Sequence, residues 1–82
     1  MTDNDAIELD YPVEFKGNKY TALTMRRPKV RDQLAADKVG VTQAERETAL
    51  FGNLCDVPPG VIGELDMKDY GRLQERYESF LS

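Results

Sequence analysis

Apolar and polar residues alternate strictly from Ile7 to Phe15, where every odd position is apolar and no even position is. This period of two is typical of a half-buried β-strand. Pro12 falls on the opposite face and has no N–H to donate, so it predicts an edge strand or a break in pairing. The predicted buried face consists of Ile7, Leu9, Tyr11, Val13 and Phe15.

A turn containing glycine and asparagine follows Phe15, and Tyr20–Met25 is predicted to be the second strand. Two registers remain open from the sequence. A two-residue loop would place Tyr20 beside Phe15, whereas a three-residue loop would place Leu23 opposite Tyr11. We favour the second register because it matches more apolar positions, and a one-residue slip would move the whole face. Residues 6–26 are thus predicted to form an antiparallel β-hairpin.

Helical patterns replace the strand pattern across residues 28–82. Pro28 suits the first position of a helix, which is predicted to continue to about Val39 and to stop at Gly40. The side chains of this helix that we expect to face the core are Val30, Leu34 and Ala35.

A second helix is predicted from Thr42 to about Cys55. Thr42 and Glu45 have the spacing of a capping box, in which each side chain bonds the backbone N–H of the other. Gly52 lies inside this helix at a cost of about 1 kcal/mol relative to alanine, which suggests close packing against another element. The residues expected to be buried are Leu50, Phe51 and Leu54.

Two shorter signals predict the remaining helices. Consecutive prolines can only stand at a helix start, so a single helical turn is predicted from about Pro59 to Glu64. Asp66 is predicted to cap a last helix, with Asp69 near its positive end. The apolar stripe of that helix comprises Met67, Tyr70, Leu73, Tyr77, Phe80 and Leu81.

Together these elements predict an α+β fold, with an N-terminal antiparallel β-hairpin followed by three to four α-helices packed on it. The 82 residues are enough for a single domain, spanning 1–82, and residues 1–5 are predicted to be disordered. A domain of this size is often marginally stable, so a partner chain or self-association is plausible.

Charge is segregated along the chain although the net charge is −4. Residues 1–15 contain five acids and no base, and residues 16–31 contain six bases and no acid. This alternation suggests that the two segments lie side by side, with the basic cluster around Arg26 paired with acids of the first strand. The overall acidity argues against a general nucleic-acid-binding protein.

The residues of catalytic and metal sites are scarce in this chain. There is no histidine, no glycine-rich phosphate loop and no pair of cysteines. We therefore expect no enzyme activity, no cofactor and no metal. Cys55 is expected to be a small buried apolar residue, and a cytoplasmic protein is expected because no long apolar run suggests a membrane span or secretory signal.

The order and spacing of several segments closely resemble the small tail assembly chaperone family of Mu-like and related contractile-tailed phages and prophages. The resemblance covers about residues 7–81. The segments that carry it are Tyr11-Pro-Val-Glu-Phe15, Leu23-Thr-Met-Arg-Arg-Pro-Lys-Val-Arg-Asp32, Leu54-Cys-Asp-Val-Pro-Pro-Gly-Val-Ile62, Leu65-Asp66, Asp69-Tyr70 and Leu73-Gln74.

The resemblance implies a non-enzymatic protein that binds the phage tape-measure protein and keeps it soluble until the tail tube assembles. It further implies action in the cytoplasm of the bacterial host and absence from the mature virion. Other implied partners are a longer frameshifted product of the same gene and further copies of the chain itself. No nucleic acid, membrane or small-molecule substrate is expected as a partner.

Candidate partner-binding residues come from the chemistry of the chain and not from the resemblance. We expect an apolar groove beside a basic joint between the hairpin and the helices. The candidates are Tyr20, Ala22, Arg26, Arg27, Lys29, Val57, Val61 and Ile62. The alternative interpretation is a small phage-encoded regulator or inhibitor that binds a host protein or, with less support, nucleic acid.

Overall fold

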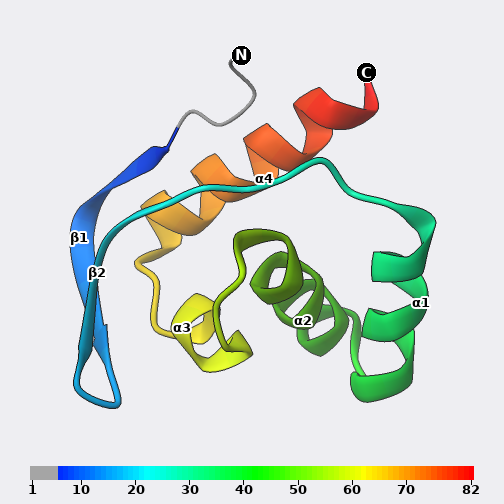
Figure 1. Ribbon diagram of the computed structural model, residues 1–82, viewed down its shortest axis with the longest axis horizontal. Coiled ribbons are helices and arrows are strands. Elements are labelled where there is room, and N and C mark those ends of the chain that lie inside the picture. The colour runs from blue at the N-terminus through cyan, green and yellow to red at the C-terminus, as the bar shows by residue number, and fades with distance from the viewer. Residues whose placement is uncertain (1–5) are drawn as a thin grey trace.

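The computed structural model describes residues 6–82, so the prediction for residues 1–5 lies outside the described residues. A two-stranded antiparallel sheet precedes four helices (Figure 1), which confirms the α+β fold. The elements are β1 (Ile7–Phe15), β2 (Asn18–Leu23), α1 (Val30–Val39), α2 (Gln43–Cys55), α3 (Pro59–Gly63) and α4 (Met67–Leu81).

The hairpin turn follows neither predicted register. Phe15 pairs with Asn18 and Val13 pairs with Tyr20 across a two-residue turn at Lys16-Gly17. Both turn residues have positive φ, at 51° for Lys16 and 83° for Gly17. Such a turn matches the twist of the two strands and accounts for the tight connection.

A break in pairing divides β1 into two parts. Ile7 pairs with Leu23 at the open end of the hairpin, and Val13 pairs with Tyr20 nearer the turn. The register of the two strands shifts between Glu8 and Val13. Pro12 lies inside this break, as predicted. Because the extra residues change which side chains face inward, Tyr11 is 56% exposed and its predicted burial is wrong.

The backbone of the break is bonded by a side chain from α4. The N–H groups of Asp10 and Tyr11 each donate to a carboxylate oxygen of Asp69 at 3.0 Å. Asp69 is fully buried, and Arg72 donates to it at 2.6 Å. Burial opposes ionisation, but the backbone donors and Arg72 keep the pKa of Asp69 below its usual value. Asp69 therefore attaches β1 to the first turns of α4, well beyond the helix-dipole role expected for it.

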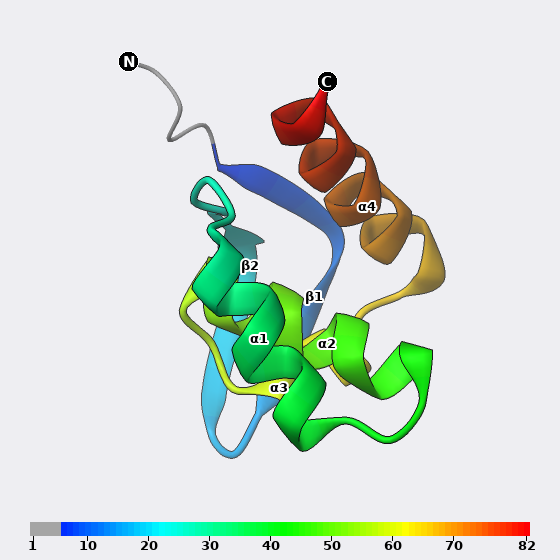
Figure 2. The same cartoon turned by 90° about the vertical axis from the view of Figure 1, so that its right-hand side faces the viewer.

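After β2 the chain remains extended and passes across the molecule to α1 (Figure 1). Met25 in this segment is fully buried, and the N–H of Arg26 donates to the carbonyl of Leu54 at 3.0 Å. In the perpendicular view α1 lies alongside α2, with α4 farther from it (Figure 2). α1 is therefore an outer element that packs mainly on α2.

α2 is the central helix and forms as predicted. The Thr42 hydroxyl accepts from the N–H of Glu45 while the Glu45 carboxylate accepts from the N–H of Thr42, which confirms the capping box. Leu50, Phe51 and Leu54 are buried, as expected. A Cβ at Gly52 would lie 2.9 Å from the carbonyl oxygen of Val57, so the predicted close packing is confirmed.

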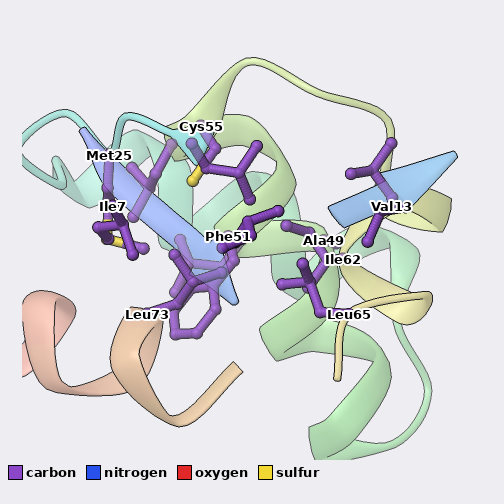
Figure 3. Close-up of a cluster of buried hydrophobic side chains, with 14 of the residues drawn as sticks. Ile7, Val13, Met25, Ala49, Phe51, Cys55, Ile62, Leu65 and Leu73 are labelled. Carbon is purple, nitrogen blue, oxygen red and sulfur yellow. The ribbon is translucent and has the colours of Figure 1, made fainter. Parts of the chain in front are cut away.

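Phe51 stands near the centre of the hydrophobic core (Figure 3). Its ring centroid lies 5.7 Å from that of Tyr70 and 5.6 Å from that of Tyr77, so it joins α2 to α4. Cys55 is buried as expected, and burial raises the pKa of its thiol to about 11. The thiolate that reactive cysteines need is disfavoured there.

The last two helices begin where the sequence predicts. α3 starts at Pro59, and the Asp66 side chain accepts from the N–H of Lys68 at the start of α4. The predicted stripe of α4 is partly wrong, because Met67 is 78% exposed and Leu81 is 63% exposed. Both residues lie at helix ends, where the core no longer extends alongside the helix.

Candidate partner-binding surface

The eight predicted partner-binding residues do not form one surface. Tyr20 and Ala22 on β2 are half-buried, as is Val57 between α2 and α3. Val61 and Ile62 of α3 are 0% and 2% exposed and belong to the core. In this fold Val61 is closed off from a partner, and Ile62 reaches the surface only at the bottom of a hollow between α2, α3 and α4. The remaining candidates, Arg26, Arg27 and Lys29, lie between β2 and α1 and are exposed.

The basic joint is bonded within the molecule rather than to the first strand. Arg26 donates two hydrogen bonds to Asp32, from Nη2 to Oδ1 at 2.7 Å and from Nη1 to Oδ2 at 2.9 Å. The backbone N–H of Lys29 also donates to Asp32, at 2.8 Å. The guanidinium of Arg27 donates to the carbonyl of Phe80 and lies 5.6 Å from the centroid of its ring.

The predicted pairing of this joint with acids of β1 is therefore wrong for Arg26 and Arg27. Asp10 of β1 instead forms ion pairs with α4, with Lys68 at 3.0 Å and with Arg72 at 3.5 Å. Opposite charges do bring distant segments together here, but the partners differ from those that the charge pattern suggests. The two arginines position the extended segment and α1.

The outward face of α1 was missed by the sequence-based prediction. Val30 and Leu34 were expected to face the core but are 77% and 58% exposed, and Ala35 is exposed as well. The buried side chains of α1 are Asp32 and Ala36, four residues apart on the same face. Because Asp32 must reach Arg26, the helix is rotated so that its larger apolar side chains point away from the core.

Two more exposed apolar side chains lie at the end of α1. Val39 is 71% exposed and Val41, just beyond the last turn, is 86% exposed. Four of the seven large apolar side chains that are exposed in the described chain thus lie within residues 30–41. Val30 and Leu34 share one face of the helix, and apolar exposure of this kind is typical of a protein-binding surface. The sequence feature that could have revealed this exposure is Asp32 at the third position of α1. From there its carboxylate can accept hydrogen bonds from both Arg26 and the backbone N–H of Lys29 at the helix start.

A second apolar hollow of about 190 Å³ lies between α2, α3 and the start of α4. The exposed side chain of Met67 lies on its rim. Its lining comprises Ala44, Thr48, Ile62, Gly63, Leu65, Met67 and Tyr70. This hollow is a smaller candidate surface than residues 30–41, and it is separated from them by α2.

Other kinds of site find little support in residues 6–82. No group of three or more histidine, cysteine or acidic residues there could hold a metal ion. A larger hollow of about 420 Å³ between β1 and α4 is lined by side chains of both charge signs, including Glu75 and Arg76. Within the same residues, no helix has the length and apolarity required to span a bilayer.

Replacing Asp32 with asparagine is expected to lower the free energy of unfolding at pH 7 by about 1.5–3 kcal/mol, the usual worth of hydrogen bonds to a charged group. Arg26 lowers the pKa of Asp32 to about 2 from 3.8, so the ion pair stabilises the fold above about pH 4. That contribution is lost as the pH falls from about 4 to about 2. The difference between wild type and D32N, measured by urea unfolding, should therefore shrink over this range.

D37N is the matched control for this prediction. Asp37 lies on the same helix, is half-exposed, and is 3.7 Å from Arg46. Its loss should change the free energy of unfolding by less than about 0.5 kcal/mol, as for other exposed ion pairs. Equal effects of D32N and D37N would contradict the role given to Asp32.

The sequence pattern of one known family, described as phage tail assembly chaperone proteins, E, or 41 or 14, matches residues 6–82. The matched range is nearly the whole chain and includes every helix and strand described above. Neither the curated proteins nor the solved structures give a match.

Proposed function

This chain belongs to the phage tail assembly chaperone family, and we propose that it binds the tape-measure protein and keeps it soluble until the tail tube assembles. The observation that carries this proposal is the exposure of large apolar side chains on an acidic chain, most of them within residues 30–41. Exposed apolar side chains that share one face of a small folded protein are typical of a protein-binding surface.

The chemistry of a tape-measure protein suits this surface. A long helical protein exposes apolar stripes along its length before the tube encloses it, and such stripes aggregate. A small protein with an apolar face and a charged remainder can cover a stripe while it presents a hydrated exterior. Several copies bound along one client would also gain from the high local concentration of neighbouring sites.

The finer parts of the proposal follow from this role. The chain acts as a non-catalytic binding protein in the host cytoplasm, leaves before the virion is mature, and serves a Mu-like contractile tail. Besides the tape-measure protein, its partners are a longer frameshifted product and further copies of itself. Of the residues first considered for binding, we retain those that reach the surface, namely Tyr20, Ala22, Arg26, Arg27, Lys29 and Val57.

Co-expression with the tape-measure protein of the same phage tests the proposal. We expect the tape-measure protein to be insoluble alone, and to become soluble and co-elute with this chain when the two are expressed together. If the longer frameshifted product is needed as well, the short chain should still co-elute with the complex. Absence of co-elution in both arrangements would favour a regulator or inhibitor that binds a host protein.

A further inference from the structure

Within the exposed region, α1 presents an apolar stripe with an asymmetric charge border. Val30 and Leu34 are four residues apart, which places them one turn apart on one face of the helix. This face is opposite Asp32 and Ala36, which pack inward. The stripe is therefore directed away from the core of the molecule.

One border of this stripe is positively charged. Arg31 and Lys38 precede and follow Leu34 by three and four residues, so both side chains flank Leu34 on the same side. Both are exposed, and neither forms an ion pair with any of residues 6–82. These two cations are therefore available to a partner.

The opposite border is neutralised inside the molecule. Asp37 accepts a hydrogen bond from Gln33 at 3.1 Å and lies 3.7 Å from Arg46. Its charge is thus already balanced by α2. The exposed face of α1 consequently combines an apolar centre, one cationic edge and one balanced edge, on a chain whose net charge is −4.

We propose that this face binds a client helix whose apolar stripe is bordered on one side by carboxylates. The inference rests on the proposed function, because it assigns the client-binding surface and the chemistry of the segment bound there. The apolar residues of the client cover Val30 and Leu34, and its acidic border meets Arg31 and Lys38. Helix-in-groove recognition commonly combines apolar anchors with a charged border that selects the partner and its orientation.

Two synthetic helical peptides provide the test, each of about 20 residues so that helix formation is practical. They share one leucine stripe, which is bordered by glutamate in the first peptide and by lysine in the second. Binding to the full chain is measured by fluorescence anisotropy at low and high salt. We expect the acidic peptide to bind about tenfold tighter than the basic one, with the difference decreasing as salt increases.

Substitutions on α1 should remove this binding selectively. L34D should lower the affinity for the acidic peptide by about tenfold or more, because it places a charge in the apolar centre of the contact. The double variant R31E/K38E should reverse the preference between the peptides. The matched controls are L81D, an exposed apolar position at the end of α4, and K19E, an exposed lysine on the hairpin. Circular dichroism should show that every variant remains folded.

Equal affinity for the two peptides, or an L34D variant that binds as wild type does, would overturn the assignment. So would concentration-dependent self-association that L34D abolishes in the absence of any peptide binding, because the occupant would then be a second copy of this chain. If wild type solubilises the tape-measure protein and L34D does so equally well, this inference fails while the proposed function stands. If wild type fails to solubilise it, the proposed function fails independently of the peptide result.

Discussion

Replacement of Asp69 with alanine is expected to reduce the free energy of unfolding by about 3–5 kcal/mol, because three hydrogen bonds to one buried carboxylate are lost together, each worth about 1.5–3 kcal/mol before water replaces part of them. The Asp69 carboxylate is fully buried and accepts from two backbone N–H groups of β1 and from Arg72. Without it, the N–H groups of Asp10 and Tyr11 lose the hydrogen-bond acceptor that residues 6–82 provide for them in the break of the sheet. Urea unfolding followed by circular dichroism measures the loss.

The pH dependence of unfolding gives a second readout for Asp69. Its pKa is lower in the folded chain than in the unfolded one, so its contribution is present above about pH 4. The contribution is lost as the pH falls further through the folded pKa, and D69A should lack this part of the acid sensitivity. E75A, an exposed carboxylate on the same helix, is the control. A D69A variant as stable as E75A would contradict the account of the hairpin.

Replacement of Phe51 with alanine should cost about 3–5 kcal/mol, because the cavity left by a buried phenylalanine adds to the lost transfer free energy. Phe51 is 0% exposed and contacts Tyr70 and Tyr77 of α4. Its removal should therefore loosen α4 as well as the core. Urea unfolding gives the free energy, and amide hydrogen exchange reports the loss of protection in α4.

Tyr11 provides the control for this second substitution. It is also aromatic, but it is 56% exposed and lies in the break of β1. Y11A should change the free energy of unfolding by less than about 1 kcal/mol, since it removes an exposed side chain and keeps the backbone N–H that donates to Asp69. Comparable losses for F51A and Y11A would show that Phe51 is not the centre of the core.

The features that depend on neighbouring residues could be predicted from the sequence. The capping box of Thr42 and Glu45, the start of α3 at Pro59 and the cap at Asp66 all use groups within three residues of each other. Their geometry is therefore encoded locally. The period of two in β1 was equally clear.

The predictions that were wrong concern features that depend on contacts between distant segments. The break in β1 is bonded by Asp69, which is 58 and 59 residues away from its two backbone donors, so the hairpin alone does not determine the register. The rotation of α1 depends on Arg26 reaching Asp32 across the helix start. Prediction from a hydrophobic pattern takes the apolar face of a helix to be the buried one. In α1 the contact between Arg26 and Asp32 instead directs the face with Asp32 inward.

The partner-binding surface could not be predicted from local sequence either. Val61 and Ile62 were candidates for an apolar partner-binding groove, yet the short helix α3 directs both into the core. Val30 and Leu34 were assigned to the core and are exposed. Tertiary packing determines which apolar residues stay exposed and can contact a partner. The local sequence does not contain that information.

Light scattering by the tape-measure protein, diluted from denaturant with and without this chain, tests the proposed function most directly. We expect an equimolar amount of wild type to suppress scattering, whereas L34D should suppress it much less and L81D, an exposed apolar position outside both candidate surfaces, should act as wild type does. Unchanged scattering at a molar excess of wild type would contradict the central claim that this chain keeps the tape-measure protein soluble.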